Sequence, residues 1–253
     1  MYPLKSLLTT AFALCIVLQL SACATTDEDS LENSDKSAAA LYEEAKAALS
    51  QEDYETSIQK LESLEARFPF GKYAQQAQLD MAYAYYKFEE PESAISAANR
   101  FIKLYPRHPH ADYAYYLRGL VKFEQGKSIF DQLSSQDAAH RDPEAARRSF
   151  QYFSDLIKRY PKSTYAKNAA ERMVYLRNNL ARHELFAAKH YLNRRAYLAA
   201  ANRARYIIET FQTTPSTADA LLLLVAAYKK LSLDDLAADA QRVYDLNFKK
   251  DRS

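Results

Sequence analysis

The chain has 253 residues, with 34 Lys and Arg against 32 Asp and Glu, so its formal net charge is only +2 at pH 7. Nucleic-acid-binding domains usually carry a marked basic excess, so we expect no nucleic acid among the partners of this chain. Only three glycines occur, whereas a sheet protein needs many of them in its tight turns. Together with a richness in good helix formers, this predicts an all-α protein.

The chain begins with a predicted signal peptide over residues 1–22. A basic residue lies near its start, an apolar stretch ends at Leu20, and a polar, acidic segment follows. The apolar stretch is shorter than the ~20 residues that span a bilayer. The run Leu20–Ser21–Ala22–Cys23 resembles the bacterial lipoprotein box. The resemblance implies cleavage before Cys23 and lipid attachment to it, and a secreted protein with a chance cysteine is the alternative.

The cysteine content restricts both chemistry and location. Cys15 is expected to leave with the signal peptide and Cys23 to carry lipid, so the mature chain would have no cysteine for a disulfide or a zinc site. In the lipoproteins that this resembles, Asp after the lipidated Cys retains the protein at the inner membrane. Ala24 follows here, so we expect an outer-membrane protein facing the periplasm. Residues 23–36 then form a flexible, acidic tether.

Helical periodicity starts near Ser37 and continues to about Phe248. In four segments, apolar residues spaced by three and four mark one helix face and lead to a terminal aromatic residue, at Phe68, Tyr105, Tyr160 and Phe211. A second helix with small and aromatic residues begins after each of them, so the unit is helix, turn, helix. The shortest spacings between the terminal residues are close to the roughly 34 residues of a tetratricopeptide repeat.

The repeated unit predicts a right-handed superhelical solenoid of five tetratricopeptide-like helix pairs. One pair cannot bury its apolar face, whereas stacked pairs can, and they form a concave binding surface. A polar loop at 126–142 and a long helix from about Thr164 to Tyr191 account for the longer spacings, and the last unit is expected to end around Tyr244. A non-superhelical helix bundle is the alternative. The units are predicted at 37–70, 71–106, 109–161, 163–212 and 215–248, grouped into N-terminal repeats over 37–161 and C-terminal repeats over 162–253.

Few side chains could carry catalysis or bind a metal ion. His108 and His110 form an H-x-H pair, but a metal site needs further ligands, and solvated loop histidines are the simpler interpretation. Glu92–Ser93 resembles the pair of helical-solenoid lytic transglycosylases, but an acidic residue after Pro91 is common in the first turn of a helix. No hydrolase or phosphate-binding motif occurs in the sequence. We expect a non-catalytic protein without cofactor or metal ion.

Residues 67–87 resemble the BamD family of outer-membrane protein assembly factors. Similar stretches follow in order along the chain, with the lipoprotein box in place, at 100–102, 116–120, 141–143 and 202–203. The chain departs from the family at Phe68, where Tyr is frequent, and in the loop before Asp142. The resemblance implies a non-catalytic lipoprotein scaffold of the machinery that folds β-barrel proteins into the outer membrane.

The resemblance also implies binding partners. The N-terminal repeats are expected to bind the C-terminal targeting strand of unfolded barrel substrates and an extended segment of a companion lipoprotein, and Phe68, Phe70 and Tyr73 match this pocket motif. The C-terminal repeats are expected to dock on the periplasmic domain of the central barrel component nearest the barrel. Arg203 matches an arginine of that contact. For Phe68 and Tyr73, a core position between the repeats is the alternative role.

Two further alternatives are left open by the sequence. Arginines at positions 194, 195, 203 and 205 form either a surface for an acidic partner or a solvated helix face. The chain as a whole could also be another solenoid lipoprotein, such as a secretin pilotin or a cell-division coordinator, or else a cell-wall hydrolase. Identification of the copurifying outer-membrane partners would distinguish these functions.

Overall fold

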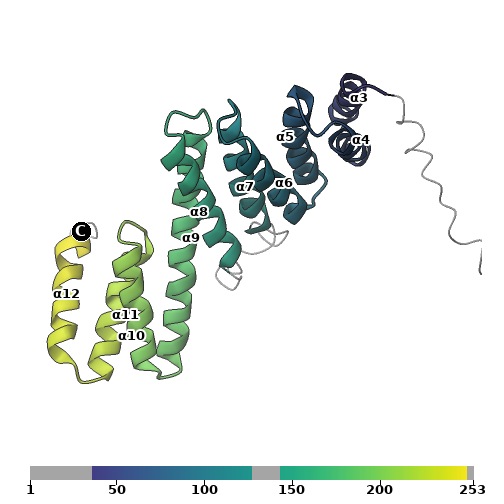
Figure 1. Cartoon of the computed structure of the whole chain (residues 1–253). Helices are drawn as coiled ribbons and strands as arrows, with labels where there is room; N and C mark the ends of the chain where they lie inside the picture. Colours follow the sequence, from purple (N-terminus) through teal and green to yellow (C-terminus); the bar gives the residue numbers. More distant parts are fainter. Residues whose placement is uncertain (1–35, 127–142, 250–253) are drawn as a thin grey trace, which may run out of the picture.

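The computed structural model describes residues 36–126 and 143–249, which form ten α-helices and no strand (Figure 1). Consecutive helices pack on one another, and they follow chain order along an elongated array from α3 to α12. The predicted all-α fold of successive helix pairs is confirmed. The helices are α3 (Ala38–Ser50), α4 (Tyr54–Arg67), α5 (Lys72–Lys87), α6 (Pro91–Leu104), α7 (Ala111–Gly126), α8 (Glu144–Arg159), α9 (Ala166–Asn193), α10 (Tyr197–Thr210), α11 (Ser216–Lys230) and α12 (Asp234–Phe248).

The terminal aromatic residues found in the sequence cap the second helix of the first four pairs. Phe68, Tyr105, Tyr160 and Phe211 are the C-caps of α4, α6, α8 and α10, and each backbone N–H donates to the carbonyl four residues earlier at 2.8 Å. In the fifth pair, α12 ends at Phe248, in agreement with the predicted unit 215–248 and one turn beyond the buried Tyr244, around which the terminal residue was expected.

A second repeated feature is the turn inside each pair. Glu52, Glu89, Arg195 and Ser232 all adopt a left-handed backbone, with φ of 61°, 60°, 62° and 57°. After each of them, the next backbone N–H bonds a carbonyl five residues back, as in a Schellman motif. Four pairs therefore turn in the same way, and the corresponding segment of the third pair lies outside the described residues.

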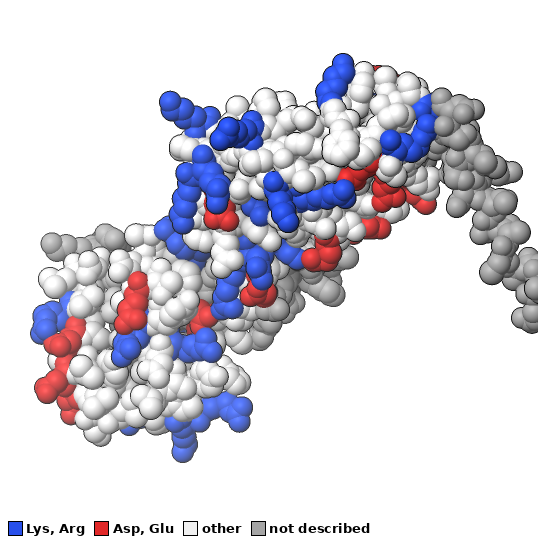
Figure 2. All heavy atoms as spheres, viewed as in Figure 1, with Lys and Arg blue, Asp and Glu red and all other residues white. Residues whose placement is uncertain are grey.

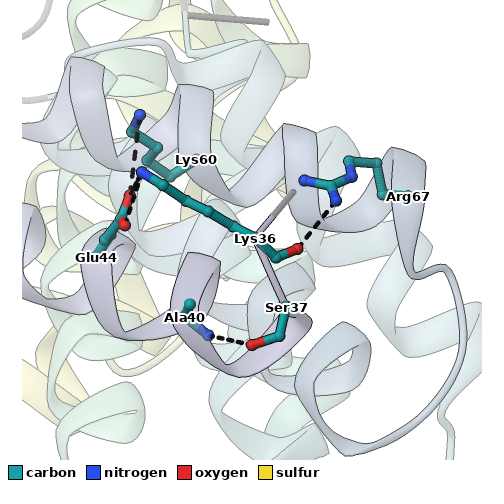
Figure 3. A network of polar contacts seen from close by, with 6 residues as sticks. All are labelled: Lys36, Ser37, Ala40, Glu44, Lys60 and Arg67. Atoms are coloured by element: carbon teal, nitrogen blue, oxygen red, sulfur yellow. Dashed lines mark hydrogen bonds and ion pairs between the residues drawn. The ribbon is translucent and has the colours of Figure 1, made fainter. Parts of the chain in front are cut away.

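The start of α3 is fixed by contacts from the preceding residue, as Figure 3 shows. Ser37 Oγ caps α3 by accepting the N–H of its third residue at 3.2 Å. Lys36 Nζ pairs with Glu44 at 2.8 Å, and the Lys36 carbonyl accepts a hydrogen bond from Arg67 Nη2 at 2.9 Å. Lys60 Nζ lies 4.0 Å from the same Glu44 carboxylate. We call Lys36, Glu44, Lys60 and Arg67 the Lys36 clamp.

The long helix α9 belongs to two hydrophobic clusters. Leu176, in its first half, packs with Phe153 and Leu156 of α8, whereas Leu185, in its second half, packs with Ile207 of α10. In Figure 1, α8 accordingly lies beside one end of α9 and α10 and α11 beside the other. The predicted boundary between N-terminal and C-terminal repeats thus precedes a helix that serves the cores of both.

Several predictions fall on residues outside the described part of the chain. These are the signal peptide over 1–22, Cys23, the tether as far as residue 35, and the polar loop over 127–142. Within the described ranges, no helix has the length and apolar character needed to cross a membrane. Lipid anchoring at Cys23 therefore stays a prediction.

Candidate binding surfaces

Two of the three predicted peptide-binding aromatics pack onto the first hydrophobic cluster. Phe68 and Tyr73 are partly buried against a core formed by α3, α4 and α5. The Tyr73 ring lies 5.6 Å from the ring of Tyr42, and the Arg67 guanidinium lies 5.1 Å from the centre of the Phe68 ring. These contacts favour the core interpretation for most of the Phe68 surface, and they fix the two ends of the turn between α4 and α5.

Phe70 lies in the middle of that turn and points away from the core. Its side chain is 88% exposed. The following residue, Gly71, has φ of 101° and forms the N-cap of α5, a conformation that side chains with a Cβ rarely adopt. The turn therefore presents a large apolar ring to solvent from a defined backbone position, as a contact residue for a partner requires.

Arg203 lies in a groove between α8, α9 and α10. The cavity around it has a volume of about 530 Å³ and is lined by Arg147, Glu184, Tyr191, Ala199, Asn202, Arg203 and Tyr206. The predicted site residue is therefore part of a concave surface at the junction of the third and fourth helix pairs. Arg147 and Glu184, which belong to this surface, were not predicted from the sequence.

A buried carboxylate holds both arginines of this cavity. The Glu184 side chain is only 3% exposed, and its oxygens accept hydrogen bonds from Arg203 Nη1 at 2.7 Å and from Arg147 Nη2 at 3.3 Å. Each arginine side chain remains 45% exposed. The hydrogen bond to Glu184 raises the pKa of the Arg203 guanidinium. Glu184 thus fixes two cations whose side chains are still about half open to solvent.

A smaller, more apolar cavity adjoins the first one and shares Arg147 and Tyr206 with it. Its volume is about 270 Å³, and the other residues that line it are Phe150, Gln151, Arg177, Leu180, Thr210 and Phe211. The rings of Tyr206 and Phe211 meet edge to face at 5.7 Å. We call the two cavities together the junction groove.

The other arginines of the predicted basic cluster do not join Arg203. Arg194 and Arg195 form the turn after α9, and Arg205 pairs with Glu209 of its own helix at 3.2 Å. Figure 2 shows both signs of charge distributed along the visible face of the molecule. The predicted basic surface is therefore reduced to Arg203, which faces the junction groove together with Arg147.

The candidate catalytic and metal-binding residues have structural partners. Glu92 lies in the first turn of α6, and a hydrogen bond from Lys122 at 2.7 Å lowers the pKa of its carboxyl group, whereas a general acid needs a raised pKa. His108 Nδ1 accepts the backbone N–H of His110. The described residues contain no group of three or more His, Cys, Asp or Glu side chains that could hold a metal ion.

Comparison with known proteins identifies the family of the chain. Residues 34–243 match the YfiO family model, described as an outer membrane lipoprotein. The chain is 46% identical over 249 residues to outer membrane protein assembly factor BamD of Neisseria meningitidis serogroup B, which covers 97% of this chain and 92% of that protein. It is 38% identical to BamD of Vibrio cholerae, over 82% of this chain and 86% of that one.

These matches confirm the resemblance found in the sequence. They support a role in outer-membrane protein assembly and an association with the outer membrane, and they agree with the expectation that the chain is not an enzyme. A secretin pilotin, a cell-division coordinator and a cell-wall hydrolase find no support in them. Because the family model matches residues 34–243 and the identity to these relatives extends over most of their length, the chain belongs to the BamD family of outer-membrane protein assembly factors.

Proposed function

We propose that this assembly factor is a periplasm-facing scaffold that binds two kinds of partner on two separate surfaces. The turn with Phe70 lies between α4 and α5, and the junction groove lies between α8, α9 and α10, at well-separated places along the array (Figure 1). The turn presents an exposed aromatic ring, whereas the junction groove presents two arginines that are bound to a buried carboxylate. This difference in chemistry within one array is the observation that carries the proposal.

The turn between α4 and α5 is proposed to bind the C-terminal targeting strand of unfolded β-barrel substrates. Barrel strands alternate apolar and polar residues, and an extended segment of this kind is recognised through contacts to its alternate side chains. Phe70 supplies an apolar contact, while Phe68 and Tyr73 hold the turn from the core side. The same N-terminal repeats are proposed to receive the extended segment of a companion lipoprotein.

The junction groove is proposed to dock the periplasmic domain of the central barrel component that lies nearest the barrel. Arg203 bonds Glu184 and Tyr191 and its side chain is 45% exposed, and a guanidinium has five N–H donors, so donors remain for a carboxylate of that domain. Because Glu184 already fixes the guanidinium, less side-chain entropy is lost when the partner binds.

The attachment to the membrane is proposed to follow the predicted division of the chain. Residues 1–22 are removed, Cys23 carries lipid, residues 23–36 form the tether, and the repeats cover 37–161 and 162–253. Each buried methylene contributes about 0.8 kcal/mol, and two or more acyl chains give stable anchoring. Cys23→Ser is expected to yield a folded, soluble periplasmic protein. Membrane fractionation in cells without the partner proteins tests this, and undiminished membrane retention would exclude lipid as the main attachment.

The two-surface model is tested by crossing two substitutions with two ligands. Phe70→Ala is expected to weaken binding of a peptide with a barrel C-terminal strand by about 1–2 kcal/mol and to leave binding of the partner domain unchanged. Arg203→Glu is expected to weaken binding of the partner domain strongly and to leave binding of the peptide unchanged. An acid-to-base change at the partner's contacting residue should restore part of the loss in the Arg203→Glu complex. Isothermal titration of both ligands measures all four combinations.

Matched controls separate these effects from a general loss of structure. Phe88→Ala removes another partly exposed aromatic at the other end of α5, and Arg205→Glu reverses a charge on the same helix as Arg203. Both controls should bind both ligands as the wild type does, and thermal unfolding is compared for all variants. If Phe70→Ala and Arg203→Glu each weaken both ligands equally, or neither ligand, the two-surface model is wrong.

A further inference from the structure

The smaller cavity, which is the apolar half of the junction groove, is not lined by Arg203 and contains a further arginine, Arg177. We propose that it receives an apolar side chain of the docking partner, flanked by two carboxylates, one bound by Arg203 and the other by Arg177. This inference rests on the proposed function, because it specifies the segment through which the partner docks. It assigns binding roles to Arg177 and to the pocket beside it.

The apolar half is large enough for a whole side chain. Its volume of about 270 Å³ exceeds the ~150 Å³ of an engineered apolar cavity that binds benzene. Phe150, Leu180 and Phe211 form its walls, and the last two are nearly buried, so they belong to the rigid core of the fourth pair. An aromatic or branched aliphatic side chain from outside would remove this lining from water.

Arg177 is the arginine of the smaller cavity that has no acidic partner among the described residues. Its Nε is buried without a hydrogen-bond partner, and no ion pair of its guanidinium occurs among the described residues. A carboxylate is the acceptor that best satisfies a guanidinium, and it can approach Arg177 from the cavity, which this partly buried side chain lines. Arg177 therefore differs from Arg147 and Arg203, which Glu184 already holds.

The spacing of the charges defines the segment that fits. Arg177 and Glu184 are separated by seven residues of α9, or about 10.5 Å along the helix, and Leu180 lies between them. Three arginines against one carboxylate leave two positive charges in the groove. The free C-terminus of a chain would supply a single carboxylate. A partner helix with acidic residues at positions i and i+7 and an apolar residue at i+3 or i+4 presents two carboxylates with the same axial spacing as Arg177 and Glu184, the residue that holds Arg203.

Two substitutions test the two parts of this proposal, with the isolated periplasmic domain of the central component as the probe. Arg177→Ala removes the second cation, and Thr210→Trp fills the apolar cavity from its exposed rim without emptying the core. Each is expected to weaken binding about fivefold to tenfold, which is about 1–1.4 kcal/mol. The controls are Arg182→Ala on α9 and Gln212→Trp after α10, which do not line the groove and should change affinity less than about twofold.

The possible outcomes separate this proposal from the one it rests on. If the domain binds the wild type and loses affinity for Arg203→Glu, but binds Arg177→Ala and Thr210→Trp as tightly as the controls, the second carboxylate and the apolar anchor are wrong while the docking function stands. If the domain does not bind the wild type, both proposals fail. Coupling between Arg177→Ala and an amide replacement of one partner carboxylate, measured in a double-mutant cycle, would identify the paired residue.

Discussion

At the turn between α4 and α5, Phe70 projects into solvent from a backbone that its neighbours fix, whereas in the junction groove Arg203 is held by its own hydrogen bond to Glu184. An exposed ring can adapt to ligands of differing sequence, because no internal contact selects its rotamer. A guanidinium fixed by a buried carboxylate suits one partner with acidic groups at defined positions. The two surfaces thus differ in how far they are organised before binding.

Substitution of Glu184 should release the two arginines of the junction groove, and we expect it to cause the largest loss of stability of all the variants. Glu184→Ala leaves Arg147 and Arg203 beside each other without their carboxylate, and we expect the free energy of unfolding to fall by about 2–3 kcal/mol, since both arginines are half exposed. Phe70→Ala removes no internal contact and should change it by less than about 0.5 kcal/mol. Urea denaturation followed by circular dichroism measures both.

The matched control for this comparison is Glu209→Ala. Glu209 also pairs with an arginine, Arg205, but both side chains are exposed, and such pairs contribute roughly 0–1 kcal/mol. Glu184→Gln keeps the shape and should fall between the two alanine variants. Equal stability of Glu184→Ala and Glu209→Ala would show that the junction groove is no more organised than an ordinary helix surface.

A second substitution probes the helices that connect the two surfaces. Gly119 of α7 faces the ring of Phe153 on α8, and a Cβ at this position would overlap that fully buried ring. Gly119→Ala should therefore lower the free energy of unfolding by about 1–2 kcal/mol, even though Ala favours the helix. The double variant Gly119→Ala/Phe153→Leu should lose less stability than the sum of the two single variants. Strict additivity would contradict the overlap.

The smallest expected effect is a pH dependence in the N-terminal half. Burial, and then the charge of His110, lower the pKa of His108, whose Nδ1 accepts the His110 N–H and whose ring packs edge to face on Phe101. The unfolded chain therefore binds a proton first, so stability falls slightly as the pH drops below about 6.5. Thermal unfolding between pH 7 and pH 5 should show this fall, and His108→Gln should reduce it. An unchanged pH profile in the variant would assign the dependence to other groups.

The repeat could be read from the sequence because its helix ends carry a chemical signal. The terminal aromatics, such as Phe68 and Tyr160, sit at helix C-caps in the structure, as the spacing of the apolar stripes predicted. The turns inside the pairs could not be found in this way. They use Glu52, Glu89, Arg195 and Ser232 in a left-handed conformation that glycine normally marks, and none of these residues signals a turn by itself.

The two candidate surfaces were predicted only in part, for a related reason. Phe70 and Arg203 were named from the resemblance, but the groove around Arg203 depends on side chains that three helices bring together. A signal for Glu184 was present in the sequence, because it is the one acidic residue on the otherwise apolar face that α9 buries. Its arginine partners come from α8 and α10, and no spacing along the chain relates them.

The Lys36 clamp gives the predicted anchor a definite length. If Cys23 carries the lipid, thirteen residue steps lead from it to Lys36, and a chain of this length extends at most about 45 Å. Because Lys36 is bound to Glu44 and Arg67, extension of the connection into α3 would first have to break these contacts. The first helix pair then moves within a hemisphere of that radius around a lipid that diffuses in the membrane plane. Under the proposed function, this length limits how far from the membrane the Phe70 turn can meet an unfolded substrate.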